Sequence, residues 1–116
     1  MINDGSFVTE TVDLLQVIGT VRARRMFGGH GIFLDDLMFA LIADNELYLK
    51  ADQHSAHFFA QLELPAFSYQ KSQGKTLRLS YYLAPDTFFE DSDDTRLWAT
   101  RAFEAALRAP RKKKKR

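Results

Sequence analysis

The chain has 116 residues, of which 46% are hydrophobic and 13% aromatic, enough for one buried core and too short for two typical domains. It contains no cysteine, which excludes a disulfide framework and thiolate metal sites and is typical of the reducing cytosol. The formal net charge is +1, but the charges are unevenly distributed, because residues 111–116 hold six of the 16 Lys and Arg. Residues 1–110 therefore carry a net charge of −5 and lack the basic excess of a compact DNA-binding domain.

The first predicted element is an amphipathic helix over residues 6–18. Its apolar residues recur three and four positions apart, which places them on adjacent rows of one helix face. Asp4 or Ser6 is available as the N-cap, and Gly19 is placed to end the helix.

A change of periodicity after residue 20 predicts an antiparallel meander. Short apolar runs there are separated by Asp35-Asp36 and by Asp44-Asn45, and these residue types tolerate the left-handed backbone of two-residue hairpin turns. We expect strands near residues 21–27, 30–35, 37–43 and 46–51.

The second half of the chain predicts a helix, a hairpin and a final helix. Asp52 can cap a helix of about ten residues that ends before Pro65, because proline disfavours helix at the residue before it. Residues 66–70 and 76–83 predict a hairpin around residues 72–74. The last helix follows residue 86 and runs up to Pro110, with the acidic run at residues 90–94 at its start and Ser92 or Asp93 as its N-cap.

This order of elements predicts the fold class. One helix, three or four strands, a helix, two strands and a helix indicate a two-layer α+β domain over residues 1–110, in which the helices pack on one face of an antiparallel sheet. The remaining residues predict a disordered basic tail, because adjacent like charges repel and bury nothing. They are Arg111, Lys112, Lys113, Lys114, Lys115 and Arg116.

Neither secretion nor membrane spanning is predicted. The N-terminus lacks a basic segment followed by an apolar stretch, and the longest apolar run, at residues 37–43, has only seven residues. We therefore expect a cytoplasmic protein without a membrane partner. The basic tail either attracts nucleic acid weakly, an acidic partner or anionic lipid through charge alone, or merely keeps the chain in solution.

A set of motifs spread over nearly the whole chain resembles the TfoX/Sxy N-terminal-domain family. It comprises Arg-Arg-Met-Phe-Gly-Gly-x-Gly-Ile-Phe from residue 24, Met38-Phe39-Ala40, Leu47-Tyr48-Leu49-Lys50, Pro65-x-Phe67-x-Tyr69, Tyr81-Tyr82 and Trp98.

The resemblance implies an α+β domain of a cytosolic bacterial protein related to regulators of competence genes. Those regulators act with a DNA-bound activator protein at promoters. In the two-domain regulators a second, C-terminal domain follows, so we expect a stand-alone N-terminal domain here. The resemblance supplies no established catalytic residue.

Three glycines, Gly28, Gly29 and Gly31, predict unusual backbone geometry. Only glycine takes a positive φ without steric cost, so we expect a turn, a bulge or a close backbone approach there, with positive φ at Gly28 and Gly29. A phosphate-binding loop is the alternative, but no Lys-Ser or Lys-Thr follows and the next residues predict a strand rather than a helix. A glycine-rich bend between two strands is therefore favoured.

Arg22, Arg24 and Arg25 form the basic cluster of the body, and Lys50 and Arg78 can lie on nearby strands. In a regular strand Arg22 and Arg24 share one face while Arg25 points to the other. A pair such as Arg24 with Lys50 or Arg78 could clamp a phosphate or carboxylate, whereas salt bridges to the many acidic residues are the simpler explanation. Except for Arg22, these residues and the three glycines are the candidate ligand or partner contacts.

No catalytic residue, metal site or cofactor is predicted. His54 and His57 lie three positions apart on the expected second helix, a spacing that can chelate a metal, but the sequence identifies no third ligand. The serines lack a nucleophile-elbow context, and the acidic run at residues 90–94 lacks the spacing of a calcium loop.

The strand at residues 37–43 is predicted to be apolar on both faces, with Leu37, Phe39 and Leu41 on one face and Met38, Ala40 and Ile42 on the other. Helices on one side of the sheet cover only one face, and Phe33 could extend the uncovered stripe. We therefore expect a homodimer or partner contact centred near Phe39. In the alternative, a terminal helix or the loop after Pro85 folds over that face and leaves a monomer.

Two functional hypotheses follow. The first is a non-enzymatic interaction module that serves transcription regulation through a protein partner. The second is a small-anion-binding protein or an enzyme that uses a groove near the bend at residues 28–31, with Arg24, Lys50 and Arg78 as anion contacts.

Overall fold

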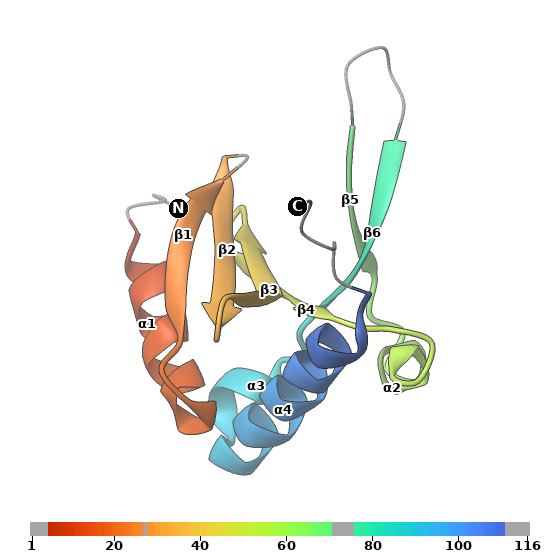
Figure 1. Cartoon of the computed structure of the whole chain (residues 1–116). Coiled ribbons are helices and arrows are strands. Elements are labelled where there is room, and N and C mark those ends of the chain that lie inside the picture. Colours follow the sequence, from red (N-terminus) through yellow and green to blue (C-terminus); the bar gives the residue numbers. More distant parts are fainter. Residues whose placement is uncertain (1–4, 27, 71–75, 111–116) are drawn as a thin grey trace, which may run out of the picture.

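The structure, a computed structural model, describes residues 5–26, 28–70 and 76–110, with the backbone alone at residues 69–70 and 76–79. These residues form a six-stranded antiparallel sheet in the order β1-β2-β3-β4-β6-β5 with helices packed on one face (Figure 1). The elements are α1 (Ser6–Leu15), the 3-10 helix η1 (Gln16–Ile18), β1 (Arg22–Met26), β2 (Gly29–Leu34), β3 (Leu37–Ala43), β4 (Glu46–Lys50), α2 (Ala56–Gln61), β5 (Ala66–Gln70), β6 (Thr76–Leu83), α3 (Thr87–Glu90) and α4 (Ser92–Arg108). The α+β class and the order of elements are confirmed, with α3 as an addition.

Two tight turns hold the meander of β2, β3 and β4. Asp35 and Asp36 have φ of 53° and 64°, and Asp44 and Asn45 have φ of 52° and 59°. Two successive residues in the left-handed region match the twist of the flanking strands, and Asp and Asn tolerate this backbone. The predicted hairpin turns are confirmed at both places.

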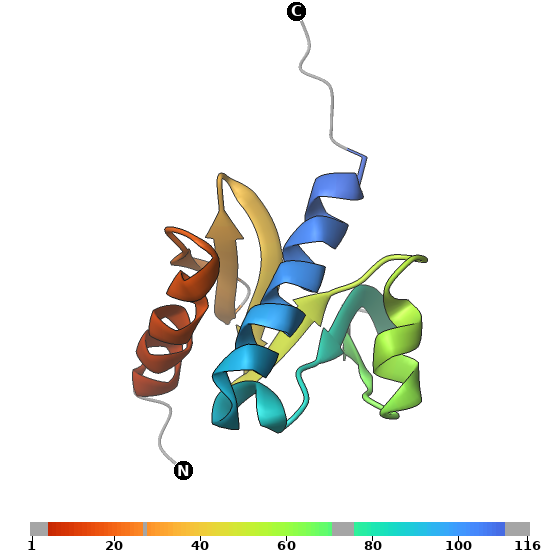
Figure 2. The ribbon, with the colours of Figure 1, turned by 90° about the horizontal axis from the view of Figure 1, so that it is seen from below.

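Helix α4 covers the middle of the sheet (Figure 2). Phe59 of α2 meets Trp98 of α4 edge to face, with ring centroids 5.0 Å apart, and stacks on Tyr82 of β6 at 5.1 Å. Small side chains let α4 lie close to β3 and β4. The residues that α4 buries are Thr95, Trp98, Ala99, Ala102, Ala105 and Ala106.

A β-bulge in β3 changes which side chains share a face. Ile32 pairs with Ala40 and Phe33 pairs with Met38, so Phe39 is the extra residue on β3. Phe39 is 0% exposed and packs edge to face on Phe103 of α4, with centroids 5.9 Å apart. The predicted partner contact centred on Phe39 is therefore wrong, because a terminal helix covers this side chain.

Leu37 and Leu41 lie on different faces of the sheet. Leu37 packs against the core cluster with Phe39, whereas Leu41 pairs with Gly31 and lies outside that cluster. The prediction that Leu37, Phe39 and Leu41 share one face is wrong, since a bulge reverses the alternation of side chains along a strand.

Two helix starts differ from the prediction. The N-cap of α1 is Gly5 at φ 90°, so Ser6 does not cap the helix, and Asp4 lies outside the described residues. Asp91 caps α4 and accepts hydrogen bonds from the backbone N–H of Asp93 at 2.8 Å and of Asp94 at 3.4 Å. The acidic run does begin this helix, one residue earlier than predicted.

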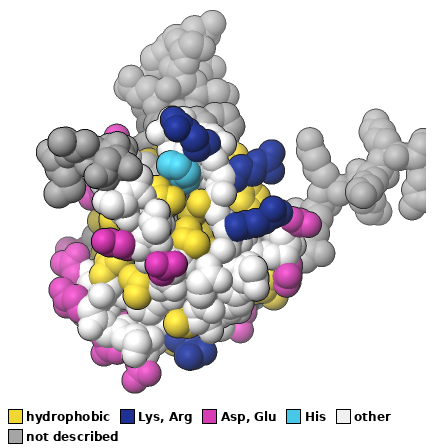
Figure 3. Space-filling model, turned by 90° about the vertical axis from the view of Figure 1, so that its left-hand side faces the viewer, with side chains coloured by type: hydrophobic (Ala, Val, Ile, Leu, Met, Phe, Trp, Pro, Cys, Tyr) yellow, Lys and Arg dark blue, Asp and Glu magenta, His cyan; other side chains and the backbone are white. Residues whose placement is uncertain are grey.

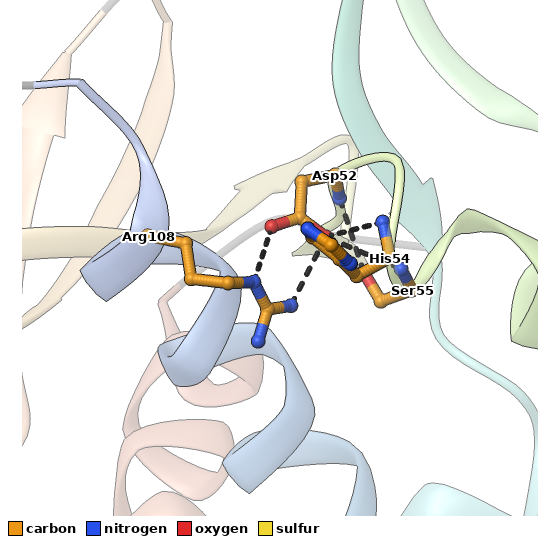
Figure 4. A network of polar contacts seen from close by, with 4 residues as sticks. All are labelled: Asp52, His54, Ser55 and Arg108. Carbon is orange, nitrogen blue, oxygen red and sulfur yellow. Dashed lines mark hydrogen bonds and ion pairs between the residues drawn. The ribbon is translucent and has the colours of Figure 1, made fainter.

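A polar network ties the segment before α2 to the end of α4 (Figure 4). Arg108 donates from Nε to Asp52 Oδ2 at 2.7 Å and from its terminal nitrogen to Oδ1 at 3.0 Å. Asp52 Oδ1 also accepts from the backbone N–H of His54 and Ser55. The N-cap position of α2 belongs to Ser55, so α2 is shorter than predicted and Asp52 instead organises the turn before it.

Strands β5 and β6 form the predicted second hairpin, while its turn at residues 72–74 and the basic tail at residues 111–116 lie outside the described residues. Within the described ranges, no helix is both long and apolar enough to cross a membrane.

Candidate functional site

One face of the sheet carries no described helix. Paired residues of an antiparallel sheet share a face, so Arg24, Gly31, Leu41, Tyr48 and Leu83 form one row across five strands. We call this side the uncovered face. Its other members, by pairing and by ring contact, are Arg22, Met26, Phe33, Met38, Lys50, Phe67 and Tyr81.

Side chains close over Gly31 at the centre of the β1–β3 part of this face. A Cβ atom at Gly31 would lie 2.6 Å from the Met26 sulfur, 3.0 Å from the Met38 sulfur and 3.0 Å from Phe33 Cε1. Phe33, Met26 and Met38 are themselves half-buried. Glycine thus lets two methionines and an aromatic ring meet in one apolar surface, and methionine adapts readily to varied partners.

Basic side chains lie on this apolar surface. The Arg24 guanidinium carbon lies 5.9 Å from the centroid of the Phe33 ring, and Lys50 Nζ lies 5.0 Å from that of Tyr81. Arg22 instead makes an exposed ion pair of 2.6 Å with Asp36. Cations held over rings keep their charge available to a partner while they cover apolar area.

Two tyrosines on the uncovered face act as neutral hydrogen-bonding groups. Burial raises the pKa of Tyr81 to about 12, and its hydroxyl donates to the Met38 carbonyl at 3.4 Å. Burial, and then the Glu46 carboxylate, raise the pKa of Tyr48, which donates to Glu46 at 3.1 Å and meets Phe67 edge to face. Both phenols therefore stay protonated at neutral pH and supply no nucleophile.

A pocket of about 290 Å³ lies near the glycine bend. Gly28 has φ 76°, as predicted, whereas Gly29 lies outside the left-handed region. Gly29 is required for another reason: a Cβ there would lie 2.2 Å from the Ile42 carbonyl oxygen. The pocket is lined by Gly5, Val8, Arg25, Gly28, Gly29, His30, Ile42, Asp44 and Asn45.

The side of the molecule where α1 and β1 lie is shown in Figure 3. Basic side chains and a histidine gather around hydrophobic side chains in its upper part, while acidic side chains lie to the left, below and beside the basic ones at the right. Basic side chains are thus concentrated in one part of this side although the body of the chain is acidic.

The structure divides the predicted contact residues between two places. Arg24, Lys50 and Gly31 belong to the uncovered face, while Arg25, Gly28 and Gly29 line the pocket. Arg78 lies on β6 opposite Ser68, and only its backbone is described. The pocket at the glycine bend is therefore not lined by Arg24 or Lys50.

Sequence reasoning missed His30 and Asp44 as pocket residues. Register alone could have indicated His30, because it lies opposite Arg25 in the β1–β2 pair. His54 precedes α2 and His57 lies in its first turn: among the residues that the structure describes, no three His, Asp or Glu side chains gather to hold a metal ion.

The fold and the motifs define a class of α+β domain: residues 13–106 match the model of the TfoX N-terminal domain, so the chain belongs to this family. The chain is also 29% identical to Protein Sxy of Escherichia coli (strain K12) over 84 residues, which cover 72% of this chain. The match spans 40% of that relative's length.

Proposed function

We propose that the chain is a non-enzymatic interaction module, a cytoplasmic accessory protein of transcription regulation related to the competence regulators. The observation that carries the proposal is the uncovered face, in which half-buried apolar side chains are bordered by Arg24 and Lys50. Contiguous apolar surface of this kind on a sheet is typical of a protein interface.

The charges on the uncovered face favour an acidic protein surface as the partner. Arg24 is exposed, and neither it nor Lys50 has a carboxylate partner among the described residues. Acidic groups opposite these cations would fix the orientation of the complex, while Phe33 and Met38 supply buried contact area. The net charge of −5 over residues 1–110 argues against the body of the chain as a nucleic-acid surface.

A second copy of the chain is the competing occupant. A two-fold contact through this face would bring the cations of one protomer toward those of the other. Among the described residues, Asp36 and Glu46 contact side chains of this face, and both are already paired, with Arg22 and with Tyr48. Light scattering of the purified chain distinguishes a different protein partner from a second copy, since a module that binds a different partner remains a monomer at high concentration.

Transcription from competence-type promoters tests the proposal in a bacterium whose own copy of this protein has been deleted. We expect Phe33→Glu and Met38→Glu to abolish the effect of the chain on reporter transcription, because each buries a charge in the interface. A matched control is Leu107→Glu, since Leu107 is exposed on α4, away from the uncovered face. Full activity of both face variants, with folding verified by circular dichroism, would refute the proposal.

A further inference from the structure

The pocket near the glycine bend is separate from the uncovered face. Arg24 and Arg25 are neighbours on β1, so their side chains leave the sheet on opposite sides, and Arg25 lines the pocket. Nothing in the proposed partner binding uses Arg25, His30 or Asp44.

Three polar side chains of the pocket have no hydrogen-bond or ion-pair partner among the described residues. Arg25 and His30 lie opposite each other in the β1–β2 pair and line the same pocket. Asp44 reaches it from the turn between β3 and β4, together with Asn45. In the described part of the chain, the side chains of Arg25, His30 and Asp44 make no hydrogen bond or ion pair, and those of Arg25 and Asp44 are exposed.

The size and lining of the pocket fit a small molecule. Its volume of about 290 Å³ is near the lower end of ligand pockets, and Val8 and Ile42 add apolar lining. Donors and an acceptor thus line one small cavity. A simple anion would be bound by Arg25 and His30 but repelled by Asp44. A simple cation would be bound by Asp44 but repelled by Arg25.

We propose that this pocket binds a small zwitterion of the α-amino-acid type. Arg25 donates two parallel hydrogen bonds to its carboxylate, and His30 adds a third from a ring N–H. Asp44 accepts from the ammonium group, with the Asn45 side-chain oxygen beside it. A zwitterion is the class of ligand that satisfies both signs of charge in the pocket at once.

Nuclear magnetic resonance titration of the full chain tests this assignment. The probes are glycine and a panel of L-α-amino acids, with acetate and ethylamine as ligands of one charge. We expect at least one amino acid to shift the amide signals of Gly28, His30 and Asn45, and acetate and ethylamine to bind roughly tenfold more weakly.

Three variants locate the binding. Arg25→Gln and Asp44→Asn should each weaken the amino-acid affinity roughly tenfold, whereas Arg24→Gln, which removes the same charge from the other face, should leave it unchanged. The assignment is overturned if no amino acid binds the wild-type chain at tens of millimolar. Acetate that binds as tightly as the amino acids, or equal losses in Arg24→Gln and Arg25→Gln, would overturn it as well.

Discussion

Gly28 and Gly29 show that adjacent glycines can be required for different reasons. Gly28 has φ 76°, which costs a residue with a Cβ about 1–2 kcal/mol, and its own Cβ would meet nothing within 4 Å. At Gly29 a Cβ would lie 2.2 Å from the Ile42 carbonyl oxygen, and this neighbour is backbone that cannot rotate away. The first requirement is conformational and the second is steric.

Alanine substitutions should separate these two requirements. We expect Gly28→Ala to lower the free energy of unfolding by about 1 kcal/mol and Gly29→Ala by about 3 kcal/mol, because the second forces β2 away from β3. Urea denaturation of both variants measures the difference. Equal losses of unfolding free energy in the two variants would contradict a steric requirement for glycine at position 29.

Part of the residue-level picture could be predicted from the sequence. The turn residues Asp35, Asp36, Asp44 and Asn45 could be identified because their conformation is set by local chemistry. The burial of Phe39 could not be predicted from the sequence, because it depends on a one-residue bulge against β2 and on the approach of α4. A groove near the glycine bend could be predicted, but its residues His30 and Asp44 could not, since strand register brings them to Arg25.

At the scale of elements, α2 is held to α4 by polar and aromatic contacts. The Arg101 guanidinium carbon lies 3.5 Å from the centroid of Phe58 and 5.1 Å from that of Trp98, so one cation bridges the two helices. Arg108 adds the bidentate ion pair to Asp52 at the entrance to α2. A short helix of six residues needs such tertiary contacts to persist.

The cation over Phe58 and Trp98 should contribute measurably to stability. Arg101→Met keeps most of the aliphatic stem and removes the charge, so we expect a loss of about 0.5–1 kcal/mol in the free energy of unfolding. Arg101→Lys should recover part of this loss. An Arg101→Met variant as stable as the wild type in urea denaturation would show that the contact contributes nothing.

The Asp52–Arg108 pair should make stability depend on pH. Hydrogen bonds from Arg108 hold the pKa of Asp52 well below its usual range, so the folded state binds a proton there less readily than the unfolded state. The stabilisation is therefore present above the ordinary carboxyl pKa of about 4 and is lost as the pH falls through the lower pKa of the folded state.

Asp52→Asn tests this linkage with almost no change of shape, since its side-chain oxygen can still accept from His54. We expect the melting temperature of the variant to be lower than that of the wild type at pH 6, and the gap to shrink as the pH falls below 4. Thermal melts across this range measure the gap. A gap that stays constant down to pH 2 would rule out a contribution from ionised Asp52.

At the scale of the whole molecule, all described helices pack on one face of the sheet, and the other face combines apolar and basic side chains. The helix-covered side could be predicted from periodicity, because amphipathic helices must bury one stripe. The composition of the uncovered face could not, since the bulge in β3 decides that Met38 and Leu41, rather than Phe39, belong to it.

The basic tail should be dispensable for folding. Deleting residues 111–116 is expected to leave the melting temperature nearly unchanged, because adjacent like charges make few folded contacts. Any weak DNA binding should be largely lost on deletion, and its salt dependence should flatten. Undiminished DNA binding by the shortened chain would contradict a tail-mediated affinity.

The central claim, that the uncovered face binds a protein partner, is tested most directly by site-specific photocrosslinking in living cells. A photoreactive amino acid at Met38 should give a covalent adduct with a DNA-binding transcription activator, identified by mass spectrometry, and Arg24→Glu should abolish that adduct. The same amino acid at Glu104, which is exposed on α4, should not give it. The absence of an adduct at Met38, or an identical adduct from both positions, would contradict the claim.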